Sequence, residues 1–281
     1  MKRVLTAAVG VPLALLALFK LPPIGFFVLV AGLFCLAAWE YVQIVAHWTP
    51  DAPMWAVIPL VPLVGFSLAP GFDSWHLTAA HLPAAHLPAA LPLLPLVLAV
   101  GVGCLVLLCS TPMDQGAPAM GSIVFGGLYL GLPVAALAEL QSRSPWLVLL
   151  LWAIVWLGDS AAFYVGTAFG RRRLAPVVSP NKSWEGALAA LAIGGLSALA
   201  FSLWRQGGVD LPLIGLALLT SVAAQFGDLV ESLIKRGAGV KDSGTMLPGH
   251  GGFLDRFDAL AFAAPVWWFA LELTDRLPLR P

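Results

Sequence analysis

Residues 225–258 read QFGDLVESLIKRGAGVKDSGTMLPGHGGFLDRFD. This stretch holds nine of the thirty charged side chains in the 281-residue chain, although most of the sequence around it is apolar. Charged side chains are costly to keep near lipid, and those that persist there commonly mark functional sites. The stretch is therefore the first candidate for a functional site.

The first part of this stretch has the period of an α-helix. Polar residues recur there at i, i+3, i+4 and i+7, which places them on one helical face: Asp228, Glu231, Ser232 and Lys235. We predict that this helix ends near Gly237 and Gly239, because glycine accepts the positive φ of a C-terminal cap. A polar loop should follow.

The second part predicts another helix, which begins at about Leu254 and has Asp255 and Asp258 in its first turn. Two helices would then each present a carboxylate, Asp228 from one and Asp255 from the other. Carboxylate oxygens are hard ligands, and no paired cysteines or histidines lie beside them in the sequence. We therefore predict that Asp228 and Asp255 bind Mg²⁺, with a second cation left open.

The composition predicts a membrane protein. The chain is 59% hydrophobic and 11% charged, whereas soluble domains are about 25% charged. Several apolar runs reach the ~20 residues that a helix needs to cross a bilayer. We predict an all-α fold, a polytopic integral membrane protein with about nine transmembrane helices. The formal net charge of +0 gives no basic field for nucleic acid, which is not an expected partner.

The distribution of basic residues predicts the topology. The nine predicted spans are Val4–Phe19, Gly25–Val45, Met54–Leu68, Leu91–Cys109, Ser122–Leu140, Trp146–Ala168, Trp184–Leu203, Leu211–Lys235 and Leu260–Leu273. With the N-terminus inside, ten of the fifteen lysines and arginines lie on the cytoplasmic side. This asymmetry follows the positive-inside rule and places both polar loops of the C-terminal half in the cytoplasm.

The two halves of the chain differ in polar content. We predict that residues 1–117 form an N-terminal transmembrane scaffold and residues 118–281 a C-terminal catalytic transmembrane region. Glu40, between two aromatic residues, is expected to be an interface carboxylate near the lipid headgroups, with substrate contact as the alternative. His81 and His86 lie in a proline-containing repeat, which favours a duplicated loop insertion over a metal site.

The loop between the sixth and seventh predicted spans is the most basic segment, FGRRRLAPVVSPNKSWEG, residues 169–186. Clustered basic residues mark the cytoplasmic side, and they also bind phosphate; both interpretations can hold together. Ser183 can cap the following helix, whose positive N-terminal end would then face an anion. Asp159, near the middle of the preceding span, should face a polar interior, either within the site or as a helix-packing contact.

The run SLIKRGAGVKDSGTMLPGHGGFLDRFD, residues 232–258, resembles the signature of the phosphatidate cytidylyltransferase family, also called CDP-diacylglycerol synthases. It matches each fixed element of that pattern: Ser, Lys-Arg, Lys-Asp, His-Gly-Gly and Asp-Arg-x-Asp. The segment SPNKSWEG is similar to a second recurrent element of the family, with Asn181 in place of the more usual glycine. The segment GDSAAFYVG around Asp159 resembles a third element loosely.

The resemblance implies a metal-assisted, in-line transfer of a cytidylyl group from CTP to phosphatidic acid. The products would be CDP-diacylglycerol and pyrophosphate, formed at the cytoplasmic face of the cell inner (plasma) membrane. The implied catalytic residues are Asp228, Asp255, Lys235, Arg236, His250 and Asp258, of which the last two have no assigned role. The implied substrate-binding residues are Asp159, Ser179, Lys182, Ser183, Ser232, Lys241 and Asp242. The glycines beside His250 would let the backbone approach the triphosphate. A homodimer is left open.

Three other interpretations compete with this one. The polar stretch could be an ordinary cytoplasmic loop, although such a loop has no need of acids inside both flanking helices. A secondary transporter also has acids at broken helices, but no inverted repeat is visible in the sequence. A related nucleotidyltransferase or lipid kinase would act on another lipid phosphate or alcohol.

Overall fold

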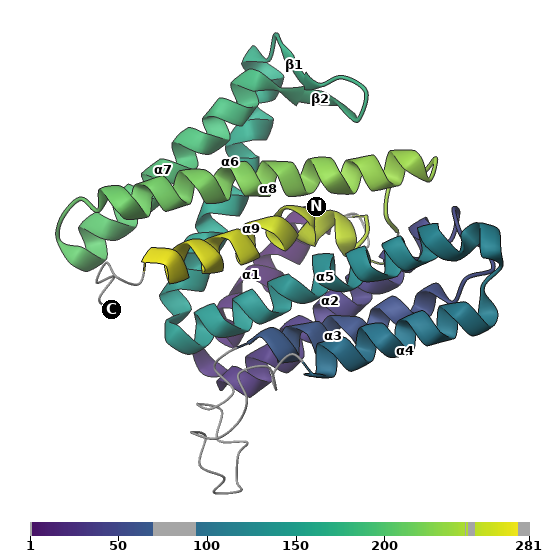
Figure 1. Ribbon diagram of the computed structural model, residues 1–281. Helices are drawn as coiled ribbons and strands as arrows, with labels where there is room; N and C mark the ends of the chain where they lie inside the picture. Colours follow the sequence, from purple (N-terminus) through teal and green to yellow (C-terminus); the bar gives the residue numbers. More distant parts are fainter. Residues whose placement is uncertain (1, 70–93, 245, 247–250, 275–281) are drawn as a thin grey trace, which may run out of the picture. The chain divides into compact units, whose positions relative to one another are not determined.

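The computed structural model describes residues 2–69, 94–244, 246 and 251–274. Within these ranges the chain forms nine α-helices and one two-stranded sheet (Figure 1). The helices are α1 (Lys2–Lys20), α2 (Pro23–Val45), α3 (Val57–Leu68), α4 (Leu94–Ser110), α5 (Met113–Arg143), α6 (Pro145–Phe169), α7 (Trp184–Gln206), α8 (Leu211–Gly237) and α9 (Leu254–Thr274). A 3₁₀ turn, Met54–Ala56, precedes α3. The predicted all-α class is confirmed.

Six of these helices are long and apolar enough to cross a membrane: α2, α5, α6, α7, α8 and α9. Shorter apolar helical segments lie at Gly10–Lys20, Met54–Leu68 and Val100–Cys109. Many large apolar side chains face outward, among them Phe163 at 65% exposed and Leu188 at 60% exposed. Such a surface suits lipid better than water. The helices therefore indicate a multi-pass membrane protein.

The chain forms two compact units. The first unit comprises Met1–Ser142 and Ala238–Phe257, and the second comprises Arg143–Gly237 and Asp258–Pro281. The boundary between them crosses the charged stretch twice, after Gly237 and again inside α9. The predicted division at residue 117 falls within α5; it concerns function rather than compactness and stays a prediction.

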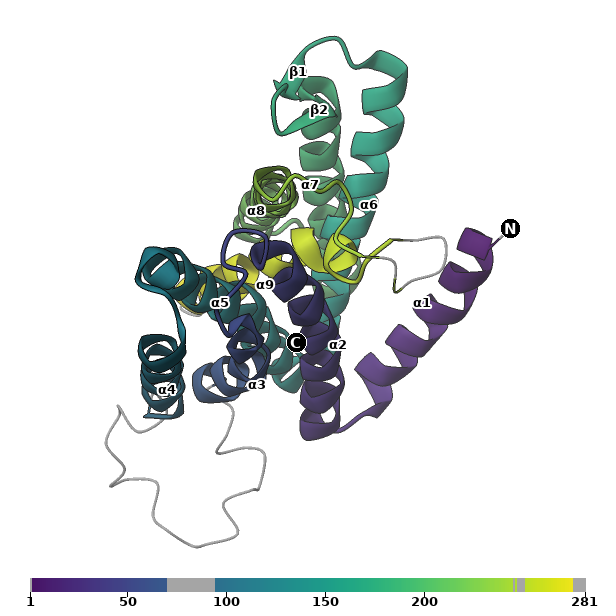
Figure 2. The same ribbon diagram turned by 90° about the vertical axis from the view of Figure 1, so that its right-hand side faces the viewer.

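In the first unit, small residues on α5 allow close helix packing. A Cβ atom on Gly131 would lie 2.6 Å from Cβ of Val64 on α3, so only glycine fits there. The hydroxyl of Tyr41 on α2 donates a hydrogen bond to the carbonyl oxygen of Ser122 on α5 (2.9 Å). Figure 2 shows α3 between α2 and α4, both of which it contacts. The contact of Gly131 on α5 with Val64 on α3 is the small-residue packing that lipid-embedded helices favour.

The N-terminal part of α5 extends further than the sequence predicted. The predicted span begins at Ser122, whereas the helix begins at Met113 and includes a polar first turn. The side-chain amide of Gln115 in that turn donates to Asp51 (2.9 Å) and its carbonyl oxygen accepts from the Asp51 backbone (3.1 Å). These contacts stabilise a helical conformation in this polar segment. The hydrophobicity of the sequence alone would have started the helix later.

In the second unit, α6, α7 and α8 pack on one another, and a hairpin joins α6 to α7 (Figure 1). The hairpin consists of β1 (Arg173–Ala175) and β2 (Ser179–Ser183), which pair antiparallel with Arg173 opposite Ser183. The sequence predicted only a basic loop here. Directly after β2, α7 begins at Trp184, and the Ser183 side chain accepts a hydrogen bond from the Gly186 N–H (3.2 Å). The predicted helix cap is therefore confirmed.

Candidate active site

The close approach of α8 and α9 in the second unit depends on Gly227. A Cβ atom there would lie 2.5 Å from the carbonyl oxygen of Asp258 and 3.2 Å from Cβ of Phe262. One residue earlier, the ring of Phe226 packs edge-to-face against Phe262, with 5.6 Å between centroids. The missing side chain lets the two backbones meet, and this brings the next residue, Asp228, close to α9.

Three carboxylates gather at this crossing. Asp228 and Glu231 lie one turn apart on α8, and Asp258 faces them from α9, with one oxygen of each within 4.8 Å of the others. Glu231 is only 1% exposed. Like charges this close repel one another, and nearby cations or protonation of one carboxyl group relieve that repulsion.

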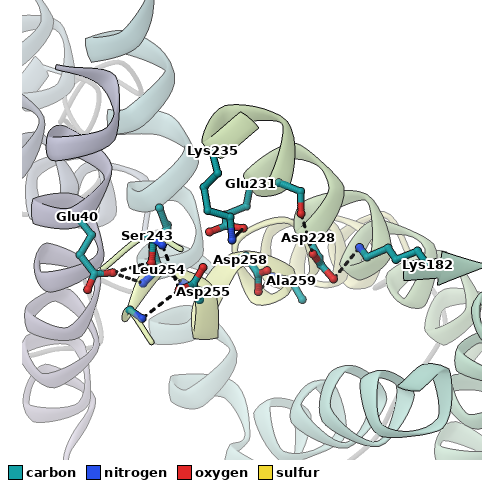
Figure 3. Close-up of polar contacts among 12 residues, drawn as sticks. Glu40, Lys182, Asp228, Glu231, Lys235, Ser243, Leu254, Asp255, Asp258 and Ala259 are labelled. Carbon is teal, nitrogen blue, oxygen red and sulfur yellow. Dashed lines mark hydrogen bonds and ion pairs between the residues drawn. The ribbon is translucent and has the colours of Figure 1, made fainter. Parts of the chain in front are cut away.

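Two lysines supply positive charge to this group (Figure 3). The Nζ atom of Lys182, on β2, lies 2.6 Å from Oδ2 of Asp228. The Nζ atom of Lys235, one turn after Glu231 on α8, lies 2.5 Å from Oε2 of Glu231. We refer to Asp228, Glu231, Asp258, Lys182 and Lys235 as the carboxylate–lysine cluster.

Two further predicted site residues of the second unit lie beside this cluster. The Ser232 hydroxyl donates a hydrogen bond to Oδ1 of Asp228 (3.4 Å). Asp159 on α6 lies within electrostatic reach of Asp228 and Lys182. Helix α6 therefore adds a fourth acid beside the cluster.

The polar loop of the first unit forms a separate hydrogen-bond network around Asp255 and Ser243. Oδ2 of Asp255 accepts hydrogen bonds from the backbone N–H groups of Ser243 (3.2 Å) and Gly252 (3.0 Å). In return, the Ser243 hydroxyl oxygen accepts from the Asp255 N–H (3.3 Å). The two residues thereby fix each other and the first turn of α9.

Glu40 on α2 completes this network, so the prediction of an interface carboxylate was wrong. Its side chain is buried, with 1% of the residue exposed. Oε2 accepts hydrogen bonds from the Ser243 hydroxyl (3.0 Å) and from the Leu254 N–H (2.9 Å). Figure 3 shows this group of side chains around Ser243. The aromatic neighbours of Glu40 in the sequence suggested a position at the lipid headgroups. The hydrogen-bond partners of its carboxylate instead come from the polar loop and the start of α9.

The structure places the other predicted site residues as follows. Ser179 begins β2, and Arg236 is exposed at the end of α8. Lys241 and Asp242 are exposed in the polar loop. His250 and the repeated histidines His81 and His86 lie outside the described residues.

The predicted metal ligands receive different surroundings. Asp228 belongs to a group of three carboxylates, whereas Oδ2 of Asp255 accepts two backbone hydrogen bonds in the first unit. The pairing of Asp228 with Asp255 on one ion therefore stays a prediction. Glu231 was not among the predicted site residues, although its spacing from Asp228 already placed both on one helical face.

Comparison with known proteins agrees with the sequence signature. The protein-family model with the description "Cytidylyltransferase family" matches residues 1–274 of the chain. The chain is similar to the phosphatidate cytidylyltransferase of Brucella suis, 43% identical over 168 residues, which are 58% of this chain and 60% of that protein. It is also similar to the proteins of that name from Bacillus subtilis (41% over 160 residues, 55% and 59%) and Staphylococcus aureus (41% over 139 residues, 49% and 54%). The matched region thus spans between 54% and 60% of these relatives' length.

Proposed function

We propose that this chain, which belongs to the cytidylyltransferase family, transfers a cytidylyl group from CTP to phosphatidic acid. The products are CDP-diacylglycerol and pyrophosphate. The relatives are named for this activity, and the chain has every fixed element of the signature in residues 232–258. The observation that supports the proposal most directly is the carboxylate–lysine cluster at the crossing of α8 and α9.

The two lysines of this cluster suit a polyphosphate substrate. During nucleotidyl transfer, negative charge increases on the α-phosphoryl oxygens and on the departing pyrophosphate. Lys182 and Lys235 each have an ammonium group beside a carboxylate, and phosphate oxygens can replace or share those partners. Lys182 also lies directly before the N-terminus of α7, which is itself favourable for anions.

The three carboxylates of the cluster fit a hard divalent cation such as Mg²⁺. Mg²⁺ is usually held by one or two carboxylates together with waters and substrate phosphates. Asp228, Glu231 and Asp258 are positioned to supply those oxygens, and Asp255 remains a further predicted ligand. When bound, the ion would neutralise charge on the triphosphate. A second cation stays a prediction.

No covalent intermediate with the protein is needed. An ionised phosphate oxygen of phosphatidic acid forms a bond to the α-phosphorus of CTP, while the bond from that phosphorus to the bridging oxygen of the β-phosphate breaks. Pyrophosphate leaves with the electron pair. The side chains of the cluster therefore have to align two anions and reduce their repulsion.

The lipid substrate and the bacterial relatives favour the plasma membrane as the location. Phosphatidic acid would reach the site from the bilayer that the apolar surface of α6, α7 and α8 faces. The excess of lysine and arginine in the hairpin and polar loop supports a site on the cytoplasmic side.

The test is incorporation of CTP label into lipid by the purified protein in mixed micelles. Label from [³H-cytidine]CTP should enter the organic phase when phosphatidic acid and Mg²⁺ are both present, and not when either is omitted. ATP and GTP should not replace CTP. In sealed proteoliposomes, accumulation of unchanged CTP without lipid labelling would instead indicate a transporter and would contradict the proposal.

A further inference from the structure

Glu40 is a buried acid that no step of the proposed reaction uses. It lies on α2, which belongs to the predicted scaffold, and its residue is 1% exposed. A carboxylate is costly to bury unless hydrogen bonds compensate for lost water. Both described hydrogen bonds of Glu40 come from the polar loop and the start of α9, and both end on Oε2. A buried charge with this set of partners requires an explanation.

The backbone of the polar loop lies close to this carboxylate at two glycines. A Cβ atom on Gly244 would lie 2.7 Å from Cδ of Glu40, and one on Gly252 would lie 2.8 Å from the same atom. Neither position has room for a side chain. Gly252 is the second glycine of the His-Gly-Gly element, and a Cβ atom there would overlap both the Ser243 hydroxyl and the Glu40 carboxylate. These contacts within the protein are sufficient to explain a glycine at position 252 without an approach of the backbone to the triphosphate.

The hydrogen bonds continue from Glu40 to Asp255. Oε2 of Glu40 accepts from the Ser243 hydroxyl, and the oxygen of that hydroxyl accepts from the Asp255 N–H. Glu40 also accepts from the Leu254 N–H, one of the N-terminal groups of α9 that have no partner within the helix. The carboxylate therefore fixes both the loop and the first helical turn.

We propose that Glu40 is a positioning residue. Its buried carboxylate holds the polar loop and the start of α9, and thereby keeps the Asp255 side chain in the position that its predicted catalytic role requires. The proposal rests on the cytidylyl transfer proposed above, in which Asp255 is a catalytic residue. Glu40 itself touches no substrate. It acts through Ser243 and the Leu254 backbone.

The experiment compares three variants with wild type. Glu40→Ala removes the acceptor. Glu40→Gln keeps a carbonyl oxygen that can accept both hydrogen bonds but removes the charge. Gly252→Ala leaves the Glu40 side chain chemically intact, and its added methyl group displaces the Ser243 hydroxyl and the Glu40 carboxylate from each other's reach. Gln43→Ala is the control, because Gln43 is an exposed polar residue one turn further along α2.

The first readout is amide hydrogen exchange of the purified proteins, which does not depend on activity. Peptides covering residues 251–257 should exchange about tenfold faster or more in Glu40→Ala and Gly252→Ala. The Leu254 N–H loses Glu40 as a fixed acceptor, and the N–H groups of Gly252 and Asp255, which donate within the same network, are held less firmly. Peptides from α7 should be unchanged. Glu40→Gln and Gln43→Ala should resemble wild type. Unchanged exchange in both Glu40→Ala and Gly252→Ala would overturn the proposal.

The second readout is turnover with CTP and phosphatidic acid. Turnover should fall about a hundredfold in Glu40→Ala, as expected for a misplaced catalytic group, and Glu40→Gln should restore most of it. Normal turnover despite fast exchange would make Glu40 merely structural. Loss in Glu40→Gln equal to that in Glu40→Ala, with normal exchange, would mean that the charge acts directly. Either result overturns the positioning role. If the wild-type protein transfers no label, the proposed function is wrong. Amide hydrogen exchange still decides in that case whether Glu40 holds the loop.

Discussion

The Nζ atom of Lys182 lies 2.6 Å from Oδ2 of Asp228, which joins the end of the β1–β2 hairpin to α8. This ion pair connects the basic loop with the acidic helix face, two features that are far apart in the sequence. It places a cation next to the acid that is the first predicted metal ligand. The contact makes Lys182 the ionic partner of Asp228, and we propose that the same lysine also contacts a phosphate group of CTP.

Replacing Lys182 should weaken CTP binding as well as turnover. Lys182→Met removes the ammonium group and leaves Asp228 without this cation, so we expect KM for CTP to rise and kcat/KM to fall about tenfold or more. Lys182→Arg keeps the charge and should retain more activity. The measurement is steady-state kinetics at fixed phosphatidic acid. An unchanged KM for CTP in Lys182→Met would argue against phosphate contact.

The three clustered carboxylates should each be needed. Asp228→Asn, Glu231→Gln and Asp258→Asn keep shape but weaken the oxygen donor, and we expect each to lower turnover about a hundredfold, or about 2.7 kcal/mol in the barrier. We predict the same for Asp255→Asn. Asp114→Asn, at an exposed acid in the first turn of α5, is the control.

The dependence on Mg²⁺ separates a ligand from a mere charge. Variants of true ligands should need more Mg²⁺ for half-maximal turnover, whereas a variant that only disturbs packing should lose activity equally at all Mg²⁺ concentrations. Near-normal turnover of Asp228→Asn at limiting Mg²⁺ would remove Asp228 from the metal site.

The crossing of α8 and α9 can be tested with alanine at two glycines of α8. Gly227→Ala would bring a methyl group to within 2.5 Å of the Asp258 carbonyl oxygen, and overpacking of this kind costs about 1–3 kcal/mol. We expect a lower thermal midpoint and lost activity, because Asp228 and Asp258 move apart. Gly215 has no atom within 4 Å of such a Cβ, and alanine there should be neutral or stabilise by about 0.5–1 kcal/mol. Equal behaviour of the two variants would contradict the packing account.

Topology is tested at the two ends of α7. Val177, in the hairpin, is 90% exposed, and Gln206 is exposed at the other end of the helix. In a background without the three native cysteines, Val177→Cys should react with an impermeant maleimide only in inverted vesicles. Gln206→Cys should react only in intact cells. The opposite pattern would place the hairpin outside the cytoplasm.

Much of the fold follows from local sequence patterns. The period of polar residues placed Asp228 and Glu231 on one face, and the glycines after Lys235 predicted the end of α8, which is Gly237. The predicted start of α9 at Leu254 is also confirmed. These features depend on neighbours within one or two turns, so residue spacing is sufficient to predict them.

The tertiary partners could not be predicted in this way. Glu40 and Ser243 are 203 residues apart, and nothing in the local sequence of either identifies the other. The hairpin was missed because its strands have three and five residues without an apolar–polar alternation. The role of Gly227 was missed because a glycine inside a helix acquires meaning only from the helix that approaches it.

The most direct test of cytidylyl transfer is a comparison of two labelled forms of CTP. In cytidylyl transfer the α-phosphorus of CTP enters the lipid, and the β- and γ-phosphorus leave as pyrophosphate. With [α-³²P]CTP, phosphatidic acid and Mg²⁺, label should therefore appear in a lipid that also contains cytidine. With [γ-³²P]CTP, label should remain in the aqueous phase as pyrophosphate. Entry of the γ label into lipid would identify a lipid kinase, and absence of both labels from lipid would contradict cytidylyl transfer to phosphatidic acid.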